Sequence, residues 1–555
     1  MSLESTELDV NVFFLFWATT LVFIMQGGFM LLEVGSVSIR NTKNILFKNG
    51  FDVCISTACF YLWGYAFAYG DDKGGLIGFS DFALAKMEEE RDDDDVSYAS
   101  GTLSHAPRAD IAFYYANFAF ALSFAATAAT IMSGAVAERM NFKAYIPLTI
   151  LTVSVIYPIV AHWIWSKQGW ASAFGEENDR LFGVGVLDFA GSLVVHVTGG
   201  TAALVTCWSL GARSDRFGVG GKINDLPMQS PVFQMFGTFL MWFGWYGFNC
   251  GSVGVLIRDE EFEGVSRTII ARAGVSTTIS AAFGGLSVVI FDLVKQSNQV
   301  SPQRMCNGIL TALVSISGPC ALVHPAFSVL IGTVAGVTYS LSSSLLLKYR
   351  IDDVVEAAPI HLFGGMWGVI ATALFTKKSF YNLAYDGSKN EREYCGAFMA
   401  CGAGGGRVLG AAIVGIIVVV LFTGSMIYAA IAILKNVFNI PLRIASAVES
   451  QGIDHSTHFG RAYTELQTTI FQYTTKSGEK AHMEMRVRAG DAAKFALALS
   501  EVMDAEAGPK AGGSGRFPGL ALDTVNRESG GVGGQQRKGF GSLLGNPASV
   551  IHESG

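Results

Sequence analysis

Long uninterrupted apolar segments restrict the fold of this chain more than any other feature of its sequence. A helix that crosses a bilayer needs about 20 predominantly apolar residues, because a helix satisfies its own backbone hydrogen bonds inside hydrocarbon. Segments of sufficient length lie at residues 11–37, 50–70, 111–137, 145–166, 189–210, 230–256, 269–292, 306–324, 326–347, 359–376 and 405–437. Only Pro325 separates two of them, so the count of eleven depends on a break at that point.

The composition supports a polytopic helical membrane protein and excludes several other classes. Only 15 % of the 555 residues are charged, compared with about 25 % in soluble domains. The formal net charge of −7 gives no sign of a nucleic-acid partner. The sequence contains no P-loop, HExxH or GxSxG motif, so we expect neither an enzyme nor a cofactor.

The eight cysteines form no CxxC pair and no Cys/His zinc pattern, so we expect no metal site. Cys395 and Cys401 share one polar loop and would pair only if that loop faces an oxidising compartment.

The distribution of lysine and arginine predicts the orientation of the chain in the membrane. The loops at 38–50, 138–143, 211–228, 293–305 and 348–356 hold 12 Lys and Arg in 59 residues. The loops between them hold 12 in 101 residues, together with 21 Asp and Glu. Because loops rich in positive charge stay in the cytoplasm, we expect the N-terminus outside and the C-terminus inside. We separately expect the plasma membrane as the location.

The polar composition after the last apolar segment predicts a separate tail. We expect residues 1–437 to form the membrane domain and residues 438–555 to form a cytoplasmic regulatory tail. Residues 490–507 have the pattern of a single helix that stops at Gly508. From about residue 508, glycine, serine and scattered charges predict that the tail is largely disordered.

Two short motifs occur twice and indicate an internal repeat. The pattern HxxGG begins at His196 and at His361, each in the fifth of a run of five apolar segments. The first segments of the two runs share the pattern GFx5G, which begins at Gly28 and at Gly247. Since five is odd, the two halves would have opposite orientations in the membrane, with a site at their interface. The predicted fold class is an all-α membrane protein with eleven transmembrane helices, arranged as two inverted five-helix repeats plus one C-terminal helix.

His196 and His361 are the strongest candidates for chemistry, because an ionisable side chain at membrane depth is costly to bury. The repeat would bring the two imidazoles to equivalent places, where they could face one another across a narrow pore and shuttle a proton. They could instead be unrelated core residues, or they could ligate a haem between helices. Glycines that draw helices together argue against the space that a haem needs.

Two further groups of residues accompany the histidines. Asp188 lies just before the segment that carries His196 and precedes Phe-Ala-Gly-Ser, where it could cap the helix or stabilise a nearby cation. Aromatic residues gather near Trp165 and Phe248, and Ser252 follows Phe248 by one helical turn. Such aromatics usually form interfacial belts, but aromatic faces together with a hydroxyl can also hold a cation.

Several longer motifs resemble the ammonium transporter family (Amt/Mep, related to the Rh proteins), in particular its plant-type Amt branch. The matching stretches are MQGGFMLLEVGSV at 25–37, SGAVAERMNF at 133–142, AHWIW at 161–165, DFAGSLVVHVTGG at 188–200, GWYGFNCGS at 244–252, DDVVEAAPIHLFGGMWG at 352–368 and GIDHSTHFGRAY at 452–463. The resemblance implies eleven helices in two inverted halves, assembled as homotrimers with one pore in each subunit. Departures are Val354, where the family commonly has proline, and His324, where plant-type members often have glutamate.

The resemblance also implies roles for individual residues. The implied substrate-binding and pore residues are Trp165, Phe124, Ser252, Phe248, His196, His361 and Asp188. The first three would recruit ammonium at the outer mouth, and the two phenylalanines would form gate rings. The histidines match the family's twin pair, and the aspartate matches its DFAG motif. Ser456 lies where the plant-type tail carries a phosphorylatable threonine, so we expect a kinase to act there.

These residues predict a transporter that recruits ammonium, removes its proton and conducts ammonia past the twin histidines. Moving a bare ammonium-sized ion into a low-dielectric interior costs on the order of 20 kcal/mol in the idealised limit. Neutral ammonia avoids this cost, so we expect ammonia to be the species that crosses. If the proton follows, transport is electrogenic; otherwise the protein is an electroneutral ammonia channel. An ammonium sensor that uses the same pore, with the tail as its output, is the alternative from another class.

Overall fold

The computed structural model describes residues 3–72, 74–87, 111–175, 179–257, 264–296, 300–386, 394–458, 460, 462, 466–474, 480–488 and 521–523. The chain divides into two units, Met1–Gly460 and Arg461–Gly555. The helix expected at 490–507 lies outside the described residues, as does most of the segment expected to be disordered.

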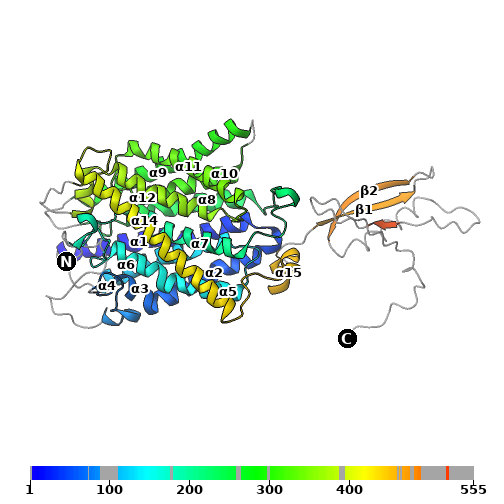
Figure 1. The fold of residues 1–555 in the computed structure, drawn as a ribbon, viewed down its shortest axis with the longest axis horizontal. Coiled ribbons are helices and arrows are strands. Elements are labelled where there is room, and N and C mark those ends of the chain that lie inside the picture. Colours follow the sequence, from blue (N-terminus) through cyan, green and yellow to red (C-terminus); the bar gives the residue numbers. More distant parts are fainter. Residues whose placement is uncertain are drawn as a thin grey trace, which may run out of the picture. The chain divides into compact units, whose positions relative to one another are not determined.

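The first unit is a bundle of long helices that lie side by side (Figure 1). Its α-helices are α1 (Leu3–Ser36), α2 (Thr42–Cys59), α3 (Tyr65–Tyr69), α4 (Ile111–Ala135), α5 (Phe142–Leu151), α6 (Tyr157–Trp165), α7 (Thr198–Leu210), α8 (Pro231–Gly251), α9 (Val265–Gln296), α10 (Pro302–Ser317), α11 (Pro325–Lys348), α12 (Gly364–Phe375), α13 (Lys378–Tyr381), α14 (Ala403–Asn436), α15 (Ser446–Gln451) and α16 (Ile453–Thr457). Wider π-helical turns lie at η2 (Phe60–Gly64), η5 (Thr152–Ile156), η8 (Ser192–Val197), η11 (Ala358–Phe363) and η12 (Asn382–Asp386). Short 3₁₀ turns lie at η1 (Ile39–Asn41), η3 (Phe82–Met87), η7 (Leu181–Gly183) and η9 (Val219–Gly221).

Within the described residues, nine helices or runs of helix are long and apolar enough to cross a membrane. This finding confirms the prediction of a helical membrane protein. The difference from the predicted eleven comes from α8 and α10. The helix α10 has only 16 residues, and Trp, Tyr and Gly lower the mean hydropathy of the 21 residues of α8. The expected break near Pro325 is present, because α10 ends at Ser317 and α11 begins at Pro325.

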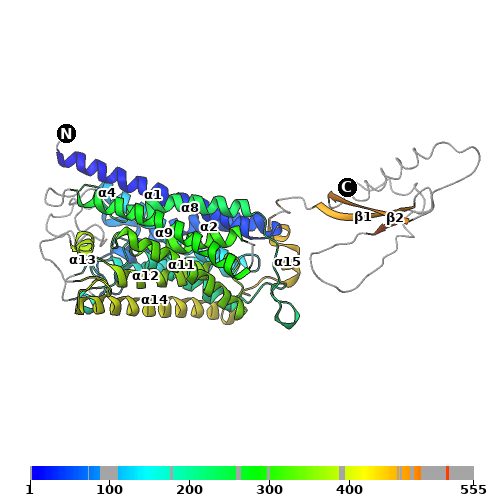
Figure 2. The ribbon, with the colours of Figure 1, turned by 90° about the horizontal axis from the view of Figure 1, so that it is seen from above.

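The helices α1 and α8 lie side by side along one edge of the bundle (Figure 2). They run antiparallel, because Gly28 packs against Met241 whereas Gly247 packs against Leu21. A Cβ atom would lie 2.5 Å from Met241 Cγ at the first glycine and 2.4 Å from Leu21 Cβ at the second. The repeated GFx5G motif therefore serves the close packing of these two helices.

Residues that follow the last long helix pack on one end of the bundle. The first unit extends to Gly460, beyond the membrane-domain boundary predicted at residue 437. The carboxylate of Asp454 on α16 accepts hydrogen bonds from the backbone N–H groups of Lys43 and Asn44, at 2.9 and 2.8 Å. We call this end of the bundle, where α1 ends and α2 begins, the tail face, and the opposite end the far face.

Cys395 and Cys401 form a disulfide in the loop that precedes α14. The sequence left the pairing of these two cysteines open.

In the described part of the second unit there are three strands, β1 (Leu466–Thr474), β2 (Lys480–Arg488) and β3 (Ala521–Asp523). They form an antiparallel sheet of order β2-β1-β3, in which Leu466 is opposite Arg488 and Thr474 is opposite Lys480. The all-α prediction holds for the membrane part, whereas the tail adds strands that we did not expect. The signal was present, because the sequence of β1 is rich in Thr, Ile, Phe and Tyr, which favour strands.

Candidate functional site

Two π-helical turns bring His196 and His361 into contact inside the bundle. The turn η8 carries His196 and leads into α7, and η11 carries His361 and leads into α12. The two Nδ1 atoms are 3.1 Å apart, and the ring centroids are 5.2 Å apart. Both side chains are buried, so one imidazole donates and the other accepts a hydrogen bond away from water. Such π-helical turns are rare and occur frequently at functional sites.

The glycines of the two HxxGG motifs pack across the histidine pair in a reciprocal manner. A Cβ atom at Gly200 would lie 2.3 Å from the backbone nitrogen of Leu362, which follows His361. A Cβ atom at Gly365 would lie 2.6 Å from the backbone oxygen of Ser192, in the turn that carries His196. Because each glycine has no side chain, the histidine-bearing turn of the other motif can pack closely against it. The resulting direct contact between the imidazoles leaves no space for a haem iron between them.

The carboxylate of Asp188 holds the start of η8. Its oxygens accept hydrogen bonds from the backbone N–H groups of Gly191, Leu193 and Val194, at 3.1, 2.8 and 3.0 Å. Burial raises the pKa of this carboxyl from 3.8 to about 6, against the effect of the backbone hydrogen bonds, which favour the charged form. Asp188 therefore has the capping geometry considered from the sequence, and it positions the turn that carries His196.

Aromatic rings form a continuous series that includes both histidines. The series consists of Trp165, Phe124, Phe248, His196, His361 and Phe29. Successive ring centroids lie 5.8, 4.0, 5.6, 5.2 and 6.2 Å apart. Phe124 and Phe248 are stacked with an angle of 18° between their planes. The stacked Phe124 and Phe248 rings therefore stand between Trp165 and the histidines in this series.

A cavity lies beyond Phe124, on the far-face side of the histidines. It is lined by Tyr69, Asn117, Phe120, Ala121, Phe124, Trp165, Phe189 and Ser252. Its size allows about two water-sized molecules. The Oγ of Ser252 donates to the backbone oxygen of Phe248 at 2.8 Å, so the hydroxyl oxygen can still accept a hydrogen bond. Trp165 Nε1 donates to the backbone oxygen of Asp188 at 2.8 Å, so Trp165 offers the cavity its ring and not its N–H.

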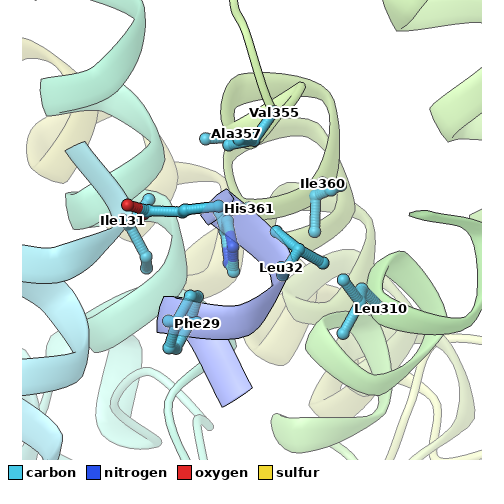
Figure 3. A pocket seen from close by; sticks show the side chains of 9 residues that line it. Phe29, Leu32, Ile131, Leu310, Val355, Ala357, Ile360 and His361 are labelled. Atoms are coloured by element: carbon cyan, nitrogen blue, oxygen red, sulfur yellow. The ribbon is translucent and has the colours of Figure 1, made fainter. Parts of the chain in front are cut away.

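A second, smaller cavity lies on the tail-face side of the pair, and His361 lines it. Figure 3 shows the His361 imidazole among Phe29, Leu32 and Ile360. The other lining residues are Glu33, Ile131, Leu310, Val355 and Ala357. The walls are apolar apart from His361 and Glu33, and the space suits about one water-sized molecule. The histidine pair therefore lies between two small cavities.

The structure brings most of the predicted site residues together. The residues that meet in or beside the two cavities are Trp165, Phe124, Ser252, Phe248, His196, His361 and Asp188. Ser456 lies apart from them, in α16 on the tail face, where its Oγ donates to the backbone oxygen of Ile453 at 3.1 Å. Sequence reasoning missed Tyr69, Asn117 and Glu33. Of these, Glu33 carried a usable signal, because it is an ionisable residue inside an apolar segment.

Comparisons with known proteins agree with this architecture. Residues 12–463 match the Ammonium Transporter Family. Ammonium transporter 1 member 1 of Arabidopsis thaliana is 37 % identical over 436 residues, which cover 78 % of this chain and 81 % of that protein. A putative ammonium transporter of Synechocystis sp. is 39 % identical over 391 residues, covering 69 % and 79 % of the two chains.

Solved structures have the same fold. A chain described as a sensor Amt protein superimposes with a TM-score of 0.68 at 28 % identity, and covers 82 % of this chain and 100 % of its own. The crystal structure of Candida albicans Mep2 gives a TM-score of 0.66 at 24 % identity, covering 80 % and 88 % of the two chains.

Proposed function

This chain belongs to the ammonium transporter family, and from that premise we propose that it separates ammonium into ammonia and a proton on the way across the membrane. The observation that carries this proposal is the buried histidine pair between two small cavities. The protein is accordingly a membrane transport protein and not an enzyme.

Recruitment takes place in the far-face cavity. The rings of Trp165 and Phe124 offer electron-rich faces to a cation, worth roughly 0.5–2 kcal/mol in such contacts. The hydroxyl oxygen of Ser252 accepts one of the ammonium protons. The Trp165 indole N–H donates a hydrogen bond to the backbone oxygen of Asp188. This contact keeps the buried carboxyl of Asp188 close to Trp165.

The stacked phenylalanines then favour neutral ammonia over the ion. An ammonium ion that enters low-dielectric surroundings loses solvation free energy on the order of 20 kcal/mol in the idealised limit. A dry passage between Phe124 and Phe248 cannot compensate for this loss. Beyond this point the imidazoles of His196 and His361 hydrogen-bond ammonia. The 3.1 Å contact between their Nδ1 atoms offers the separated proton a path of its own.

The same proposal includes the architecture expected from the sequence. With α8 and α10 counted as spans, eleven helices cross the membrane as two inverted halves of five plus α14. The antiparallel packing of α1 with α8, and the reciprocal contacts of Gly200 and Gly365, support this arrangement. The N-terminus and the far face then lie outside, the tail lies in the cytoplasm of a plasma-membrane protein, and three copies assemble with one pore each.

Two alternatives keep the same site and differ in output. In an electroneutral ammonia channel the proton stays behind. In an ammonium sensor the tail reports occupancy of the pore, and the likeness to a chain described as a sensor Amt protein favours this as the second candidate.

Purified protein in liposomes on a solid-supported membrane tests the proposal. A jump in ammonium concentration should evoke a current that potassium does not, because potassium has no proton to give up. Uptake of ammonium without current would select the neutral channel. Correctly inserted protein that gives neither current nor uptake would contradict transport.

A further inference from the structure

Glu33 is a buried carboxylate that the pathway described so far does not use. It lies on α1, close to the end of that helix at Ser36, and is only 1 % exposed. Its oxygens accept hydrogen bonds from Ser133 Oγ at 2.7 and 2.8 Å and from Asn49 Nδ2 at 2.7 Å. It lines the tail-face cavity together with His361.

The internal repeat gives Glu33 the same place in its half that Ser252 has in the other half. Alignment of the two GFx5G motifs pairs Phe29 with Phe248 and Glu33 with Ser252. Each of these phenylalanines contacts one histidine of the pair. Each polar residue follows its phenylalanine by one helical turn and lines the cavity on its own side. The two cavities thus have equivalent polar positions, and the tail-face one carries a carboxylate in place of a hydroxyl.

Two other ionisable side chains are buried beside Glu33. Lys48 and Asp52 on α2 are 3 % and 1 % exposed. Lys48 Nζ donates to the backbone oxygen of Ser133 at 3.4 Å and lies 4.1 Å from the centroid of the Tyr145 ring. The Tyr145 hydroxyl donates to Asp52 Oδ2 at 2.5 Å, and Asp52 Oδ1 has no hydrogen-bond partner among the described residues.

Glu33, Asp52 and Lys48 together carry one net negative charge when all three are ionised. Arg139 also acts electrostatically on Lys48, but its guanidinium donates its hydrogen bonds to backbone oxygens and not to either carboxylate. Burying a net negative charge is costly, so the cluster favours uptake of one proton or one small cation. The tail-face cavity is where either could meet Glu33, since its other walls are apolar except for His361.

We propose that Glu33 accepts the proton after the histidine pair and gives it to ammonia in the tail-face cavity. This inference rests on the proposed function. The proton released by ammonium at the far face passes through the imidazoles, and the Glu33 carboxylate takes it up as a carboxylic acid. Ammonia that reaches the cavity then accepts this proton, the carboxylate is restored, and ammonium leaves. One ammonium ion enters and one leaves, so the cycle needs no other reactant.

Glu33→Gln and Glu33→Asp separate this role from a structural one. Glutamine keeps the shape of the side chain and an acceptor for Ser133 but cannot take a proton. Aspartate keeps the titratable group but is one methylene too short for the hydrogen bonds of Glu33. We expect the glutamine variant to lose ammonium current at least about 100-fold, the scale of a lost proton-transfer group, and the aspartate variant to retain much more of it. A carboxylate that only ties helices together would give the reverse order.

The measurement uses full-length protein in liposomes, at equal inserted amounts, with ammonium itself as the probe. If the parent neither takes up ammonium nor gives a current, both the proposed function and this inference fail. If the parent takes up ammonium without a current, or if Glu33→Gln carries the parent current, transport stands and this inference is wrong.

Asn49→Ala provides a second test in case Glu33→Gln does not accumulate. This change removes one hydrogen bond to the carboxylate and leaves Glu33 in place. The titratable groups that face Glu33 are Lys48, Asp52, Tyr145 and, across the cavity, His361. Because these groups are unchanged, a shift in the dependence of the current on tail-face pH would report titration of Glu33. An unchanged pH profile would overturn the inference.

Discussion

Replacement of either histidine by leucine tests the transport mechanism most directly. His196→Leu and His361→Leu each remove the Nδ1–Nδ1 hydrogen bond of 3.1 Å and keep a side chain of similar bulk. The remaining imidazole is left with an unpaired polar atom in a dry site, which costs about 1–3 kcal/mol of stability. Leucine is favourable at this depth and offsets part of that cost, so we expect the fold to survive.

The expected effect on transport is much larger than the effect on stability. Within the ring series, only the two imidazoles can both accept and donate a proton. Proton transfer by a positioned side chain contributes typically 10²–10⁴-fold. We therefore expect ammonium-dependent current to fall at least about 100-fold in each variant, while a slow leak of neutral ammonia persists.

The assay is current on a solid-supported membrane after an ammonium jump, normalised to inserted protein. Thermal unfolding in detergent measures the stability cost in parallel. His324→Leu is the control for loss of an imidazole outside the pair, because His324 is exposed at the start of α11. Its Nδ1 accepts a hydrogen bond from the Ala326 backbone N–H, so this control should lose the stability of one helix cap and keep the parent current. Leucine variants that both carry the parent current would mean that the histidines are packing residues and that the proposed proton path is wrong.

Three further predictions follow from the same contacts. Trp165→Leu should weaken apparent ammonium affinity from a few-fold to about thirty-fold, the range of a cation–π contact; unchanged transport at low ammonium would make Trp165 a packing residue. Ser456→Asp should place a negative charge beside Asp454, loosen α16 from the start of α2 and close the pore, and uptake like that of Ser456→Ala would contradict this. Asp188 has a pKa near 6 in the folded protein against 3.8 for an exposed carboxyl, so the folded state binds more protons between these values. The stability of the parent relative to Asp188→Asn should therefore fall by up to about 3 kcal/mol as pH rises from about 4 to 6; detergent unfolding at both pH values checks the sign, and a relative stability that rises with pH would refute it.

The sequence predicted the parts of the site that depend on a repeat or on residue type. The two HxxGG motifs identified His196 and His361, and the structure pairs them. The glycines were expected to let helices approach, and the contacts of Gly200 and Gly365 with the opposite turns give the physical reason. The π-helical form of these turns was not predictable, because it depends on how the two halves meet and not on local propensity.

Charges near the ends of apolar segments were the main source of error. Lys48 was counted among the positive loop residues that set orientation, yet it lies within α2 and is 3 % exposed. Glu33 and Asp52 were passed over for the same reason, since each lies close to a predicted segment boundary. Periodicity and hydropathy give boundaries only to within a few residues, which is about one helical turn. At that precision a buried charge cannot be told from a charge at the membrane surface.

The two equivalent positions carry different polar groups, and this difference fits the proposed proton path. On the far face, Ser252 and the aromatic rings can hold an ammonium ion but cannot keep its proton. On the tail face, Glu33 can keep the proton and then return it. If both positions carried a hydroxyl, the proton would stay on an imidazole in a dry site until ammonia arrived. That charged imidazolium state is high in free energy. A carboxylate after the histidines lowers the energy of that state. It therefore speeds passage in both directions without changing the equilibrium distribution of ammonium, which the gradient and the membrane potential alone determine.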